Sequence, residues 1–102
     1  MNKVIKNGKV AILISPGFGA GWYTWNSDHP ELIFHPDIVQ AVLDGDNQKA
    51  GEIASRICPG CYIGGADDLQ VEWVDEGAKF EIEEYDGSET LHIIGERDYL
   101  EA

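Results

Sequence analysis

Hydrophobic residues follow three different patterns along the chain, and each pattern predicts a different kind of element. Residues 10–14 form a continuous apolar run, which is typical of a strand buried on both faces. We therefore expect a central strand there. The pair Asn7-Gly8 separates this run from Val4-Ile5, and an Asn-Gly pair between apolar runs predicts either a small hairpin or a frayed lead-in to the strand.

Helical periodicity covers the middle of the chain. Residues 36–43 begin with proline, carry apolar residues on one side and are followed by Gly45, which predicts a helix. Asp46 is suited to cap a second helix over residues 47–57, whose apolar positions recur with a spacing of three and four. Residues 28–31 can start a shorter helical turn.

Strict alternation of apolar and polar residues begins at residue 69. Residues 69–74 and 79–83 predict an antiparallel hairpin with one apolar face and one wet, acidic face. The alternation breaks at Glu84-Tyr85, so we expect a bulge near the end of the second strand. Asp86-Gly87 predicts another tight turn before a last strand over residues 90–94.

Together these elements predict one α+β domain over residues 1–102: a small, mostly antiparallel sheet of three to five strands, with two short helices packed on one face. The 43% hydrophobic content supports a core. The tail from residue 95 is expected to be exposed. No stretch approaches the roughly 20 apolar residues of a membrane span, and the amino terminus lacks a secretory signal, so we expect a cytoplasmic protein.

The formal net charge of −12 is concentrated in the last third of the chain. Residues 1–27 carry three lysines and no acid, whereas residues 67–102 carry thirteen acids and two bases. This distribution disfavours direct binding to nucleic acid or to an anionic membrane, because both need a cationic surface. It favours a partner with a basic surface. The simpler interpretation is that the acids are solvated strand faces that aid solubility.

A glycine- and aromatic-rich loop over residues 15–26 follows the central strand. It lacks the third glycine of the dinucleotide fingerprint, where Trp22 stands, and the Lys-Ser/Thr pair of a P-loop. It is therefore a tight turn that packs aromatics against the sheet, a cradle for an anion, or a contact loop whose exposed aromatics anchor a partner. As candidate binding residues we select Phe18, Trp22, Tyr23 and Trp25 of this loop together with Glu81, Glu83 and Glu84 of the acidic hairpin.

Cys58-Pro-Gly-Cys61 has the spacing of a redox pair or of half a zinc site. In thioredoxin-like proteins the first cysteine begins a helix, whereas here the pair follows a helix. A zinc site would need further ligands, and no histidine lies at ligand spacing in the sequence. Plain buried thiols remain the third interpretation. Ser15 lacks the G-x-S-x-G context of a nucleophile and the acids form no calcium loop, so we assign no catalytic residue, metal or cofactor.

The segments over residues 15–25, 35–46 and 71–74, with the acidic hairpin, resemble a group of small uncharacterised proteins of bacteriophages and prophages. The similarity covers most of residues 10–90 and implies a context but no activity. In that context we expect a stoichiometric binding protein that engages and inhibits a basic host protein, such as a nucleic-acid-handling or defence protein, in the host cytoplasm. The alternatives are a small-ligand protein of the nucleotide-binding type, or an enzyme, built on the loop, and a zinc-stapled structural domain. An uncovered sheet edge would allow a homodimer.

Overall fold

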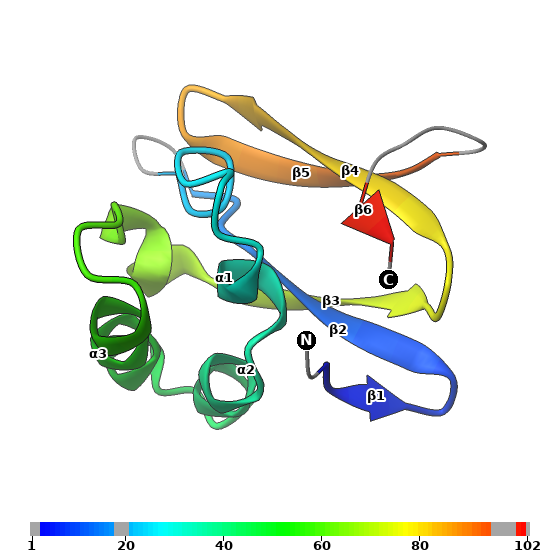
Figure 1. Ribbon diagram of the computed structural model, residues 1–102, viewed down its shortest axis with the longest axis horizontal. Coiled ribbons are helices and arrows are strands. Elements are labelled where there is room, and N and C mark those ends of the chain that lie inside the picture. Colours follow the sequence, from blue (N-terminus) through cyan, green and yellow to red (C-terminus); the bar gives the residue numbers. More distant parts are fainter. Residues whose placement is uncertain (1–2, 18–20, 95–99, 102) are drawn as a thin grey trace.

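The computed structural model describes residues 3–17, 21–94 and 100–101 (Figure 1). Its strands are β1 (Ile5–Lys6), β2 (Lys9–Ile14), β3 (Gln70–Asp75), β4 (Lys79–Tyr85), β5 (Ser88–Ile94) and β6 (Leu100–Glu101). Its helices are α1 (Glu31–Phe34), α2 (Pro36–Leu43), α3 (Asn47–Ile57) and the 3₁₀ helix η1 (Gly64–Asp68). No helix among these residues is both long enough and apolar enough to cross a membrane.

β2 is the middle strand of a first antiparallel sheet with the order β1-β2-β3. The hairpin between β1 and β2 turns at Asn7 and Gly8, which both have positive φ, as a type I′ turn requires. Residues 10–14 are buried along the whole strand. The predicted central strand is confirmed, and of the two alternatives for the segment before it the structure shows the small hairpin.

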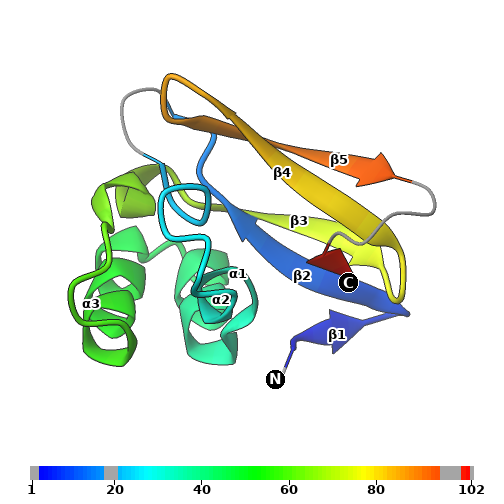
Figure 2. The ribbon, with the colours of Figure 1, turned by 45° about the horizontal axis from the view of Figure 1, so that its top comes forward.

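β4, β5 and β6 form a second antiparallel sheet with the order β5-β4-β6. The predicted hairpin between residues 69–74 and 79–83 is therefore wrong: β3 pairs with β2, and the turn at Gly77 carries the chain from one sheet to the other (Figure 2). The predicted bulge is also absent, because the pairing of β4 with β5 runs without interruption to Tyr85 opposite Ser88. The predicted turn at Asp86-Gly87 joins these two strands.

The two longer helices have the predicted bounds, and each begins at a side-chain cap. His35 Nδ1 accepts a hydrogen bond from the backbone N–H of Asp37 at the start of α2. Asp46 Oδ1 accepts one from the backbone N–H of Lys49 at the start of α3. These caps satisfy backbone donors that have no partner within their helix. α1 is the short helical turn expected near residue 31.

Alternate side chains of β2 contribute to two separate parts of the core. Ala11 and Leu13 pack with α2, α3 and Trp22. Val10, Ile12 and Ile14 pack with Phe80 of the second sheet and with the end of α1. The predicted α+β class and the helical cover on one face are confirmed, but the second sheet covers the other face of β2. Most of the predicted exposed tail lies outside the described residues.

Candidate functional site

Glu89 is the polar centre of the region in which the glycine-rich loop meets the second sheet. Its side chain is only 1% exposed. Oε1 accepts a hydrogen bond from the backbone N–H of Ser15 over 2.9 Å. Oε2 accepts bonds from the backbone N–H of Trp22 over 3.1 Å and from both the N–H and the hydroxyl of Thr24 over 2.8 Å. The loop thus holds an anion, and that anion is a carboxylate of the same chain.

The same loop is also attached to η1. The Ser15 hydroxyl donates to the carbonyl of Gly65 over 2.8 Å, and the Asp68 side chain lies directly against Gly17. These contacts, with those to Glu89, make this part of the loop a packed turn. The backbone N–H groups of Ser15, Trp22 and Thr24 already donate to Glu89, so they are not available to bind an added phosphate.

The aromatic residues of the loop divide between core and surface. Trp22 is 0% exposed, and its indole N–H donates to the Leu32 carbonyl over 2.7 Å. In this structure the ring is part of the core and has no exposed surface, unlike the exposed contact residue that the loop was expected to supply at this position. Tyr23 is half-buried and packs against both parts of the core. Trp25 is 43% exposed, and its ring lies 4.8 Å from that of Tyr62. Phe18 lies outside the described residues.

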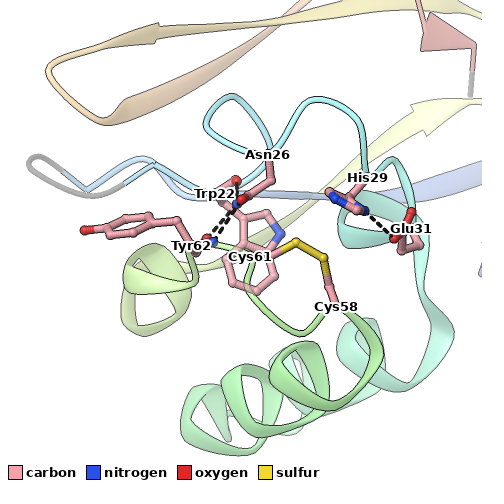
Figure 3. A network of polar contacts seen from close by, with 7 residues as sticks. All are labelled: Trp22, Asn26, His29, Glu31, Cys58, Cys61 and Tyr62. Atoms are coloured by element: carbon pink, nitrogen blue, oxygen red, sulfur yellow. Dashed lines mark hydrogen bonds and ion pairs between the residues drawn. A yellow bond between two sulfur atoms is a disulfide. The ribbon is translucent and has the colours of Figure 1, made fainter.

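Asn26 forms hydrogen bonds that connect the glycine- and aromatic-rich loop, residues 15–26, to the segment that follows α3 (Figure 3). Its Nδ2 donates to the carbonyls of Trp22 and Tyr62 over 2.7 and 2.6 Å. Its Oδ1 accepts from the backbone N–H of Tyr62 over 2.9 Å. Loop residues 22–29 are thereby placed beside the cysteine turn.

This placement brings His29 next to both cysteines (Figure 3). Cys58 and Cys61 form a disulfide with their Cα atoms 5.6 Å apart. The candidate ligand atoms of the three residues lie within 4.8 Å of one another. His29 Nδ1 also lies 3.1 Å from Glu31 Oε1. A pocket of about 320 Å³ adjoins the cluster, and its lining includes Trp25, Asn26, Asp28, His29, Gly60 and Cys61.

Tyr23 is the loop residue whose acidity the fold changes. Burial raises the pKa of its phenol above the ordinary value of 10.0, and the negative charge of Asp28 raises it further. Both effects disfavour the phenolate, because it would be poorly solvated and close to another anion. Tyr23 is therefore neutral at physiological pH.

The acidic residues of β4 point to two different faces. Glu81 and Glu83 alternate with the buried Phe80 and lie on the outer face of the second sheet, followed by Tyr85, which is 80% exposed. Glu83 Oε2 lies 3.4 Å from Nε2 of His92. Glu84 belongs to the opposite face and accepts a hydrogen bond from the Gly87 N–H over 2.6 Å. The three acids selected from the sequence therefore do not share one face: Glu81 and Glu83 lie on the outer face with Tyr85, and Glu84 lies on the other.

Exposed acids are not confined to this hairpin. They also occur on α2, α3, η1 and β3, and the helical layer alone displays Asp37, Asp44 and Glu52. The concentration of charge in the last third of the sequence therefore does not translate into a single acidic face. What distinguishes the outer face of β4 is that two carboxylates and an exposed tyrosine lie on one strand.

Sequence reasoning missed the roles of Glu89, Tyr62 and Tyr85. For Glu89 there was a usable indication, because by alternation it shares the inner face of its strand with Leu91 and is an acid at a core position. For Tyr62 no local pattern existed.

Comparison with family models, curated proteins and solved structures finds no match for this chain.

Proposed function

We propose that this protein is a stoichiometric binding protein that engages a partner with a basic surface through the outer face of β4. The observation that carries the proposal is the row formed by Glu81, Glu83 and Tyr85 on that face. Residues two apart on a strand are about 7 Å apart, so the row presents two regularly spaced carboxylates and a ring.

The two kinds of side chain contribute differently to such an interface. Carboxylates steer a basic partner towards the surface and exclude acidic ones, and the net charge of −12 strengthens this steering. An exposed tyrosine supplies apolar contact area and a hydrogen-bonding hydroxyl, which is why tyrosine is frequent among residues that dominate binding energy. Trp25 and Tyr62 form a second exposed aromatic contact.

The phage context suggests which partners to expect. We propose a host protein whose basic surface ordinarily holds nucleic acid, or a host defence protein, and that the bound acidic protein blocks that surface. Carboxylates then occupy positions where phosphates would lie.

Charge reversal with a matched control tests this proposal. Tagged wild-type protein is compared with Glu81→Lys/Glu83→Lys, with Tyr85→Ala, and with Asp44→Lys/Glu52→Lys, which makes the same change in net charge on the helical layer. The partner retained by the wild type at low salt is identified, purified and titrated by calorimetry. We expect both hairpin variants to weaken binding by at least about 10-fold, and the helical control to weaken it far less.

Two results would contradict the proposal. If no purified partner binds the wild type, there is no stoichiometric complex. If the helical control loses as much affinity as the hairpin variant, binding reflects net charge alone and not the face of β4.

The pocket beside Trp25 favours a second candidate function, namely binding of a small ligand. It is about 320 Å³ in volume and combines an aromatic wall with Asp28 and His29. A thermal-shift screen of nucleotides, sugars and metal ions tests it, because a ligand at about 100 times its Kd stabilises the folded state by about 2.7 kcal/mol. A stabilising ligand whose effect disappears in Trp25→Ala supports this function, and no shift across the screen contradicts it.

A further inference from the structure

The cysteine turn and His29 come from distant parts of the sequence, yet they face one another. Cys58 is buried at the end of α3, and Cys61 is half-buried three residues later. The backbone N–H of Cys61 donates to the carbonyl of Cys58, and Gly60 takes the positive φ that this turn needs. Both sulfur atoms are thereby brought to one side, towards His29 (Figure 3).

The orientation of His29 is set by Glu31. Nδ1 of the imidazole lies 3.1 Å from the Glu31 carboxylate, which favours the tautomer that carries its proton on Nδ1. Nε2 is then left with a lone pair. A histidine that donates its other ring N–H to a carboxylate is the usual arrangement at protein metal sites, because the carboxylate both orients the ring and makes it more basic.

We propose that, once the disulfide is reduced, Cys58, Cys61 and His29 bind one zinc ion, with Glu31 as a positioning residue. Two thiolates and an imidazole are a ligand set that suits zinc. The disulfide is the oxidised state of the same site, and it cannot bind zinc through thiolates because its two sulfur atoms are bonded to each other. These four residues belong to a different part of the molecule from the outer face of β4.

Reduction of the Cys58–Cys61 disulfide requires an external reductant, either a thiol or a phosphine. A phosphine and one water molecule convert the disulfide into two cysteine thiols and leave a phosphine oxide, whereas two external thiol molecules give the same two cysteine thiols and one external disulfide. Zinc then replaces the two thiol protons, which are released to solvent, while His29 binds through its neutral nitrogen without losing a proton. Binding therefore strengthens as pH rises through the range in which cysteine thiols deprotonate.

The available space fits this coordination. Zn–S bonds of about 2.3 Å and a Zn–N bond of about 2.0 Å in a tetrahedron place the ligand atoms about 3.5–3.8 Å apart. The three ligand atoms already lie within 4.8 Å of one another, so side-chain rotations after reduction are enough to reach it. The adjoining pocket is lined by both His29 and Cys61, and a water molecule in it would supply the fourth ligand.

The test uses the full-length protein, reduced with a phosphine under anaerobic conditions and given Zn²⁺ alone. Competition with a chromogenic chelator measures affinity, and Co²⁺ in place of Zn²⁺ gives a thiolate charge-transfer absorption band. We expect one zinc per reduced chain and none specifically bound by the oxidised chain. His29→Ala should lower the affinity by more than about 100-fold, and Glu31→Gln by about 10- to 100-fold.

Controls separate this site from incidental binding. His92→Ala removes an exposed histidine on β5 and should leave zinc affinity unchanged. Circular dichroism of each variant without metal shows whether it is folded. The proposal is overturned if the reduced wild type binds zinc no more tightly than His29→Ala, or if His92→Ala loses as much affinity as His29→Ala.

Discussion

Ser15 and Glu89 exchange two hydrogen bonds across the molecule. The Ser15 N–H donates to the Glu89 carboxylate over 2.9 Å, and the Glu89 N–H donates to the Ser15 carbonyl over 2.8 Å. Ser15 directly follows β2 and Glu89 lies in β5, so this pair connects the first sheet to the second. With its further bonds to Trp22 and Thr24, Glu89 connects the second sheet to the aromatic loop as well.

Glu89→Ala should destabilise the fold by about 3 kcal/mol or more, because it leaves buried N–H donors of Ser15, Trp22 and Thr24 without an acceptor. Glu89→Gln keeps the shape but turns an NH₂ group towards these donors, so we expect a loss of about 1–3 kcal/mol. Urea unfolding followed by circular dichroism measures both. Glu84→Gln, at an exposed position of β4, is the control and should change stability by less than about 1 kcal/mol. Equal losses at the two positions would contradict the central role of Glu89.

Truncation of the two tryptophans of the loop should lower stability by very different amounts. Trp22→Ala removes a fully buried ring and its hydrogen bond to Leu32, so we expect a loss of about 3–5 kcal/mol. Trp25→Ala removes a ring that packs at a tilt against Tyr62 at the surface and should cost about 1 kcal/mol or less. Chemical unfolding followed by circular dichroism is the measurement, since tryptophan fluorescence changes with the substitutions themselves. A large loss for Trp25→Ala would show that this ring is part of the core.

Predictions from the sequence were accurate where a few neighbouring residues decide the structure. The bounds of α2 and α3 follow from Pro36, the Asp46 cap and the spacing of apolar residues, and the two tight turns follow from Asn7-Gly8 and Asp86-Gly87. Each of these is a local interaction. The same reasoning placed residues 10–14 at the centre of a sheet, because a run without polar positions has no side that could face water.

The errors concern which distant segments meet. Alternation shows that β3 and β4 are strands, but the alternating pattern is the same whether they pair with each other or with β2 and β5. The division of the core between two sheets was therefore not predictable from periodicity. His29 reaches Cys58 only because Asn26 binds the backbone of Tyr62, 36 residues away, and no spacing in the sequence records that contact.

Gly65 occupies a position where two backbones approach closely. A Cβ atom added there would lie 2.6 Å from the carbonyl oxygen of Gly21 and 2.7 Å from the Ser15 hydroxyl. Because the first contact is with backbone, Gly65→Ala should destabilise the protein by about 1–3 kcal/mol. Gly64→Ala is the matched control: the three atoms nearest to its added Cβ lie at the far end of the exposed Tyr62 side chain, which can rotate away, and we expect less than about 0.5 kcal/mol. A tolerated Gly65→Ala would mean that η1 is free to move away from the loop.

Tyr23 should make stability fall with pH in strongly alkaline solution. Its pKa in the folded protein is raised above 10.0 by burial and by Asp28, so the folded state keeps its proton at pH values where the unfolded chain has lost it. Stability is therefore unaffected by this group below about pH 10 and decreases as pH rises through the folded-state pKa. We expect Tyr23→Phe to lose less stability than the wild type between pH 9 and about pH 11 when both are unfolded with urea.

Spectrophotometric titration checks the cause of that effect. The difference between wild type and Tyr23→Phe isolates the phenolate of Tyr23 from those of the other three tyrosines. Asp28→Asn removes the nearby negative charge and should lower the pKa of Tyr23, though not fully to its ordinary value, because burial is the larger cause. If the difference titration of the wild type has its midpoint at or below pH 10, Tyr23 is solvated in the folded protein, and the loop does not pack against the core as described.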